Sequence, residues 1–358
     1  MPKLPPVGSA RIEEVAKRPW RPTRRQVVQS VVGLGLAVGL VVWGLPHFAQ
    51  TTWHEVFDVL GRLGPAQGAW LFVLMVTGLY LYTFMLTGSL PGLTHGRALI
   101  LNVCGSSVGN LLPGGGAAGV AATYALCRSW GFSRRDISTS VIVTGVWNVL
   151  ARVLLPVIGI AALLSNASQL PKAVVRGGIA GGVVAAALLL AFIAVLVSAR
   201  AATWIGRGID GALRPLLRRR RRQPMKADEL IHDLRSRVTN VVRTGWLSMT
   251  FGILGYFGVW FVLFWFCLTS VGVSVPLTQA FAAYAVGRLL TAVGITPGGL
   301  GVTESGTAAV LVAWGADGAA SAAAVVLFAV YTHLMEIPLG AAGWVAWGLT
   351  PKHKPGPA

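Results

Sequence analysis

The sequence predicts an all-α polytopic membrane protein with about six full spans and two glycine-broken re-entrant helix pairs in an inverted repeat. Of its 358 residues, 54% are hydrophobic and only 12% are charged, which is too apolar for a soluble domain. Several apolar runs reach the roughly 20 residues that a helix needs to cross a bilayer. Two glycine-rich breaks, at residues 112–119 and 296–304, interrupt apolar segments of this kind.

The two glycine-rich breaks indicate an internal repeat. Pro113 and Pro297 lie 184 positions apart, and the same offset pairs Trp130-Gly131 with Trp314-Gly315 without a gap. Each Pro-Gly-Gly is therefore followed, at the same distance, by the same Trp-Gly pair. We interpret the chain as two related halves centred on these breaks.

Hydrophobic length defines the predicted elements. Full spans are expected at residues 27–45, 66–90, 137–164, 174–197, 246–271 and 319–349. An amphipathic segment over residues 52–62 fits a helix that lies in the outer interface. The broken elements cover residues 98–129 and 277–314. A half-element of about 15 residues reaches only ~22 Å, short of a ~30 Å hydrocarbon core, so each pair is expected to turn back inside the membrane.

The net charge of +18 is concentrated between the apolar runs, where the positive-inside rule expects it. The basic segments that we assign to the cytoplasm are the tail 1–26, the loop 199–243 and the tail 350–358. With this orientation, the span 66–90 runs opposite to its repeat partner 246–271. The repeats, over about residues 66–164 and 246–349, are therefore predicted to be inverted, an architecture typical of transporters.

Of the 12 acidic residues, only Glu304 and Glu336 fall inside the predicted membrane elements, and their candidate partners are Arg152 and Arg288. A carboxylate in a bilayer needs a partner or a wet cavity. Arg152 and Glu336 occupy equivalent positions of the two halves, so they either form an ion pair that fixes helix register or line a polar path. Glu304 follows a glycine break, where it either caps a helix or binds Arg288, unless it contacts a ligand.

The breaks themselves are candidate headgroup sites, because a half-helix that starts inside the membrane points free backbone N–H groups at a ligand. The alternative is that the glycines only allow close helix packing. The further candidate residues at and around the breaks are Asn110, Gly114, Gly115, Asn148, Thr296, Gly298, Gly299, Thr303 and His333.

Other classes of function find little support. The glycine-rich segments lack a Walker lysine and strand context, so no nucleotide cofactor is expected. Cys104, Cys127 and Cys267 lack metal-ligand spacing, so no metal is expected either. The basic loop has no interleaved aromatic residues, which argues against nucleic acid as a partner and for anionic lipid.

The sequences around the breaks resemble the membrane region of lysylphosphatidylglycerol synthases. Residues 111–115, and residues 295–301 followed by Glu304, carry this resemblance, which extends over about 27–349 as one membrane domain. The region also occurs alone, as a flippase-like family of bacterial and archaeal membrane proteins. The resemblance implies movement of an aminoacylated phospholipid between leaflets, while a separate soluble domain makes that lipid. The chain ends at Ala358, so we expect no such domain here.

The sequence thus predicts a lipid translocase in a bacterial plasma membrane, with both termini cytoplasmic and no catalytic residues. Its expected partner is a phospholipid or a polyprenyl-phosphate-linked lipid. A homodimer is possible. One alternative is an intramembrane headgroup transferase with Glu304 or Glu336 as the base and His333 beside it. Another is a scaffold that acts through its basic loop.

Overall fold

A computed structural model describes residues 38–111, 115–164, 227–291 and 296–352, together with Gly35 and Ala187. For residues 227–236 it describes the backbone alone. The described part is helical throughout, as predicted. The predictions that lie outside the described residues concern the tail 1–26, most of the first span, the span 174–197, the loop residues 199–226, Gly114 and the tail residues 353–358.

Four helical segments are long and apolar enough to cross a membrane within the described part of the chain. They are α5 (Pro65–Ser89), α8 (Arg134–Leu164), α11 (Ala227–Ser270), and a last span built from α14 (Gly318–Ala329), η5 (Val330–Leu334) and α15 (Glu336–Leu349). Four of the six predicted spans correspond to these segments. The helix is longer than the predicted span 246–271, because α11 begins at Ala227 and runs through the amphipathic stretch before it.

Four shorter helices flank the two glycine breaks. They are α6 (His95–Leu111), α7 (Gly115–Ser129), α12 (Leu277–Leu290) and α13 (Val302–Ala313), with the 3-10 turn η4 (Pro297–Gly299) before α13. The longest of the four has 17 residues, which at ~1.5 Å per residue is short of a ~30 Å hydrocarbon core. Helix α6 packs against α7, and α12 packs against α13.

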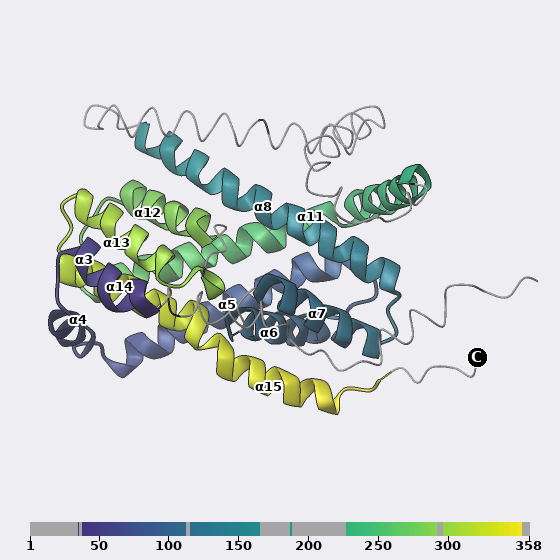
Figure 1. Cartoon of the computed structure of the whole chain (residues 1–358), viewed down its shortest axis with the longest axis horizontal. Coiled ribbons are helices and arrows are strands. Elements are labelled where there is room, and N and C mark those ends of the chain that lie inside the picture. The colour runs from purple at the N-terminus through teal and green to yellow at the C-terminus, as the bar shows by residue number, and fades with distance from the viewer. Residues whose placement is uncertain are drawn as a thin grey trace, which may run out of the picture.

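Short helices cover one end of the bundle. They are η1 (Leu40–Gly44), α3 (Leu45–Ala49) and α4 (Trp53–Leu60), of which α4 confirms the helix predicted over residues 52–62. Thr52 and Glu55 form a capping box at its start, with the Thr52 N–H donating to Glu55 Oε2 over 3.0 Å. Hydrogen bonds from Thr51 and Thr52 lower the pKa of the Glu55 carboxyl. Helices α3 and α4 pack on α13 and α14 (Figure 1).

Helices α5 and α11 form the central contact of the bundle. Glycines allow their backbones to approach, because a Cβ at Gly245 would overlap Gly88 and one at Gly252 would overlap Met85. Around this pair, α12 packs on α8 and α6 packs on α15. Figure 1 shows α15 beside α6 at one side of the bundle and α8 crossing α12 at the other.

The two Trp-Gly pairs end α7 and α13 with the same backbone geometry. Gly131 has φ 93° and Gly315 has φ 87°, values that favour glycine. The Phe132 N–H donates to the Cys127 carbonyl, and the Ala316 N–H donates to the Leu311 carbonyl, each over 3.1 Å. These bonds satisfy the last carbonyls of each helix, as in a Schellman motif.

Candidate functional site at the centre of the membrane domain

A cavity of about 700 Å³ lies between the two broken elements. Its walls come from α5, α6, α7, α8, α11, α12, η4, η5 and α15. The cavity gathers most of the candidate residues predicted from the sequence. Those that line it are Asn110, Gly115, Asn148, Arg152, Arg288, Thr296, Gly298, Gly299, His333 and Glu336. Glu304 and Thr303 do not line it, and Gly114 lies outside the described residues.

Arg288 projects from α12 into a group of aromatic rings. Its guanidinium carbon lies 5.1 Å from the ring centre of Phe328 and 5.7 Å from those of Trp260 and Tyr284. Contact with ring faces stabilises a cation where water is scarce. The side chain is only 6% exposed, and its buried Nε has no hydrogen-bond partner.

Arg152 lines the same cavity from α8, and its buried Nε is also without a hydrogen-bond partner. Neither of the ion pairs that the sequence left as alternatives forms. Within the described residues, the one ion pair closer than 4.0 Å joins His54 and Asp58 at the surface. Arg152 is therefore not bound to Glu336.

Glu336, the first residue of α15, binds an amide instead of an arginine. Asn110 Nδ2 donates to Glu336 Oε2 over 2.9 Å. Asn110 belongs to the last turn of α6, and α6 packs along α15, which brings the two side chains together. This hydrogen bond ties the first broken element to the last span, with the carboxylate 3% exposed.

His333 ties the last span to the second broken element. Its Nε2 lies 3.1 Å from the Gly298 carbonyl oxygen, which can only accept, so Nε2 carries the proton. Gly298 adopts φ 61°, a left-handed conformation that glycine tolerates. His333 lies in the π-turn η5, which precedes Pro338, a residue with no N–H to continue the helix ladder.

Glu304 caps α13, which is the structural alternative that the sequence left open. Its Oε2 accepts the Gly301 N–H over 2.6 Å, in the first turn of the helix. The Thr303 hydroxyl donates to the Gly299 carbonyl over 3.0 Å within the same turn. The start of α13 is therefore already occupied by a carboxylate of the chain itself.

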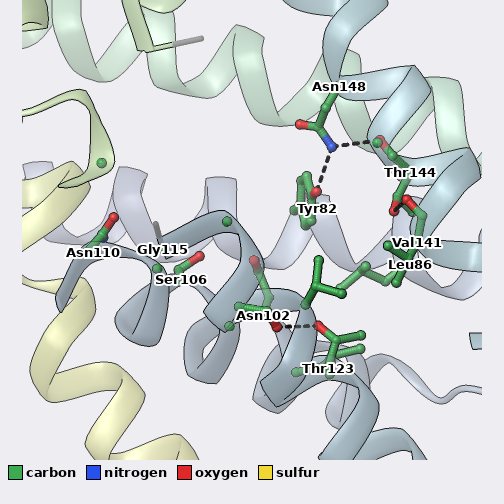
Figure 2. Close-up of a pocket in the computed structure, with 18 of the residues that line it drawn as sticks. Tyr82, Leu86, Asn102, Ser106, Asn110, Gly115, Thr123, Val141, Thr144 and Asn148 are labelled. Carbon is green, nitrogen blue, oxygen red and sulfur yellow. Dashed lines mark hydrogen bonds between the residues drawn. The ribbon is translucent and has the colours of Figure 1, made fainter. Parts of the chain in front are cut away.

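The cavity is also lined by uncharged polar side chains. Figure 2 shows Asn102, Ser106 and Asn110 of α6, with Thr144 and Asn148 of α8 across the pocket from them. Asn148 Nδ2 donates to the Tyr82 hydroxyl over 2.8 Å and to the Thr144 carbonyl over 2.9 Å. Glycines of α6 and α7 also line the cavity, namely Gly105, Gly109, Gly115, Gly116 and Gly119. They allow close packing of the two helices, because a Cβ at Gly115 would overlap Gly109 and one at Gly119 would lie 3.1 Å from the Gly105 carbonyl oxygen.

The aromatic part of the site was missed from the sequence. Tyr256 and Trp260 lie one helical turn apart on α11, with ring centres 4.5 Å apart, and Tyr82 lies 5.1 Å from Tyr256. All three line the cavity. In an apolar span this spacing indicates ordinary packing, so the sequence carried no signal that separates a cavity wall from a helix contact.

A family model described as the lysylphosphatidylglycerol synthase TM region matches residues 30–340 of this chain. The match covers nearly the whole segment over which the two breaks suggested the resemblance. The family is a membrane domain associated with lipid modification or transport. No curated protein matches the chain.

Proposed function

We propose that this chain, which belongs to the lysylphosphatidylglycerol synthase TM-region family, is a lipid translocase that moves a phosphate-bearing lipid between leaflets. The observation that carries the proposal is the central cavity, whose volume of about 700 Å³ suits a lipid headgroup. Two arginines line it, and no described carboxylate lies within 4.0 Å of either. Unpaired cations are costly inside a bilayer, so they mark a functional path.

The charge distribution supports an orientation with the C-terminal end of α15 in the cytoplasm of a bacterial cell. The described basic residues at the starts of α6 and α8, in the first half of α11 and at the ends of α7 and α15 are Arg97, Arg134, Arg135, Arg237, Arg243, Arg128 and Lys352. At the other end, Arg62 is accompanied by Glu55, Asp58 and Asp317. The positive-inside rule assigns the basic end to the cytoplasm.

Reciprocal contacts support an inverted repeat of re-entrant pairs. The first helix of each broken pair packs on the last span of the other half, α6 on α15 and α12 on α8. Gly159 and Gly343, 184 positions apart, make both contacts close. A Cβ at Gly159 would lie 3.3 Å from Ala282 Cα, and one at Gly343 would lie 3.0 Å from Cys104 Sγ. Such symmetry lets two halves exchange conformations around a central site.

The cavity extends toward the proposed cytoplasmic end, where Leu90, Leu93 and Ile137 line it. Toward the other end, the Asn110–Glu336 and His333–Gly298 contacts join the two breaks. In this arrangement a headgroup enters from the cytoplasmic leaflet. Separation of these two contacts would open the path toward the outer leaflet.

Leaflet exchange of fluorescent phospholipids in proteoliposomes tests the proposal. The intact protein is compared with Arg152→Ala and Glu336→Gln, and with Arg135→Ala as an exposed control at the helix surface. We expect exchange in the intact protein and the control, and a loss of at least tenfold in the two cavity variants. No exchange by folded intact protein would reject translocation. It would leave the headgroup transferase, tested by headgroup analysis of the same lipids, or the scaffold.

A further inference from the structure

We propose that the cavity selects a lipid phosphodiester of a polyol, such as glycerol or a sugar, and rejects lipids with cationic headgroups. This inference rests on the proposed function and specifies its substrate class. Three features of the described residues carry it: buried polar atoms without partners, the excess of positive charge, and a set of hydroxyl and amide side chains around the arginines.

The first feature is a set of buried polar atoms that lack hydrogen-bond partners and belong to residues that line the cavity. These atoms are Arg152 Nε, Arg288 Nε, Trp260 Nε1 and Thr296 Oγ1. Arg288 is 6% exposed and Thr296 is 4% exposed, so bulk water does not satisfy them at the surface. Buried polar groups normally have a partner, and donors gathered in this way suit a ligand rich in acceptor oxygens. A phosphate supplies such oxygens.

The second feature is the charge count. Arg152 and Arg288 supply two permanent positive charges, and Glu336 is the one carboxylate among the residues that line the cavity. The described lining therefore carries a net charge of +1 if Glu336 is ionised, or +2 if Glu336 is protonated. A phosphodiester lowers this charge, whereas a lysylated phosphodiester, whose two amines outweigh its phosphate, raises it. Electrostatics thus favours the uncharged polyol over the amino acid.

The carboxylates also argue against an amine subsite. Glu304, which a cationic headgroup would otherwise use, lies outside the central cavity and caps α13. Glu336 already accepts a hydrogen bond from Asn110. The aromatic rings of Trp260, Tyr284 and Phe328 face a cation of the chain itself, Arg288, so they are not a free cage for a ligand amine.

The third feature is a set of uncharged hydroxyl and amide side chains close to the arginines. Asn102, Ser106 and Thr123 lie on α6 and α7, and Thr144 and Asn148 lie on α8, on the two turns that precede Arg152. Such groups both donate and accept hydrogen bonds, as hydroxyls of a polyol do. A phosphate at Arg152 and Arg288 would place its headgroup among these hydroxyl and amide groups.

The position of the phosphate differs from the one suggested by the glycine breaks. A helix N-terminus is an anion site only while its N–H groups are free. At the start of α13, Glu304 accepts the Gly301 N–H, and a second anion there would meet a carboxylate. The guanidinium groups of Arg152 and Arg288 are the cations left to receive the phosphate among the residues that line the cavity.

Equilibrium binding to the purified full chain in detergent tests this selection without requiring transport. The probes are the dioctanoyl forms of phosphatidylglycerol, lysylphosphatidylglycerol and phosphatidylcholine, with dioctanoylglycerol and inorganic phosphate to separate acyl chains and free anion. Binding is measured by the shift in melting temperature and by isothermal calorimetry. We expect phosphatidylglycerol to bind at least tenfold more tightly than each of the other probes. Equal or tighter binding of the lysylated lipid, or no binding of phosphatidylglycerol, would overturn the inference.

Two variants with opposite expected effects on binding distinguish a change in charge from a general loss of folding. Arg152→Gln should weaken phosphatidylglycerol binding at least roughly tenfold, because a hydrogen bond to a charged group is lost. Glu336→Gln keeps an acceptor for Asn110 while removing the one negative charge of the described lining, so it should bind phosphatidylglycerol more tightly. Weaker or unchanged binding in Glu336→Gln, or unchanged binding in Arg152→Gln, would contradict the charge argument. Arg135→Gln is the matched control and should bind as the intact protein does.

The outcomes of this experiment and of the leaflet assay separate the two proposals. Selective binding without leaflet exchange would keep the substrate class and reject translocation. Exchange of the lysylated lipid at the rate of phosphatidylglycerol would keep translocation and reject the selectivity.

Discussion

The crossing of α5 and α11 allows a sharp test of how this bundle holds together. A Cβ at Gly252 would overlap the Met85 backbone nitrogen, and it would lie 3.1 Å from both the Leu81 carbonyl oxygen and the Phe84 carbonyl carbon. Ordinary contacts of a Cβ begin at 3.4 Å. Because the neighbours are backbone atoms, no rotamer change relieves the overlap. Gly252→Ala must therefore move α5 away from α11.

The expected cost follows from that displacement. A gap of 0.5–1 Å forfeits roughly a quarter to a half of the dispersion energy at a contact, and overpacking of this kind costs about 1–3 kcal/mol. Alanine also favours a helix over glycine by about 1 kcal/mol, which would mask part of the loss. Gly258→Ala on the same helix gains the same propensity and meets nothing within 4 Å. The difference between the two variants should thus be about 1–3 kcal/mol.

Unfolding in mixed micelles by increasing SDS, followed by tryptophan fluorescence, measures this difference. We expect Gly252→Ala to unfold at lower SDS than Gly258→Ala, and Gly258→Ala to match or exceed the intact protein. If Gly252→Ala proved as stable as Gly258→Ala, the close backbone contact between α5 and α11 would be refuted.

Three further outcomes follow from contacts described above. Glu304→Ala should lower stability by about 0.5–2 kcal/mol through loss of the α13 cap, while Glu304→Gln, which keeps an acceptor, should lose less; SDS unfolding checks both. Cys267 is fully buried and should stay unlabelled by a bulky maleimide until the protein is unfolded, as read by mass spectrometry. The pKa of Glu55 is lowered in the folded state. The contribution of its carboxylate to the stability of α4 is therefore present above the unfolded pKa and is lost as pH falls through the folded pKa. The protection factors of the α4 amides, which correct hydrogen exchange for its intrinsic pH dependence, should therefore fall in acid, and Glu55→Gln, which has no charge to lose, should remove this fall.

Features that depend on residues close together in the sequence were predicted correctly for this chain. Hydropathy located the four described spans, because apolar length depends on residues next to one another. The capping role of Glu304 was also open to local reasoning, since the helix start and the carboxylate lie three residues apart. The equal turns at Gly131 and Gly315 were marked by their shared Trp-Gly sequence.

Partners that come from distant helices could not be predicted in the same way. Arg152 and Glu336 were natural candidates for an ion pair because they occupy equivalent positions, yet Glu336 meets Asn110, since α6 packs on α15. Arg288 is surrounded by rings from α11, α12 and α14. Such an arrangement depends on helix rotation, which the polar and apolar pattern of a buried helix does not specify.

The π-turn η5 determines what the last span can contact. The Met335 N–H donates to the Val330 carbonyl over 2.8 Å, so this turn holds one residue more than an α-helical turn. One extra residue changes the phase of every later side chain by about 100°. As a result, the side of α14 that faces α11 and α13 before the turn is not continued by the side of α15 that faces α6 after it. Deleting a single residue from η5 would leave the hydropathy of the span almost unchanged, yet it would rotate Gly340 and Gly343 away from their contact with α6.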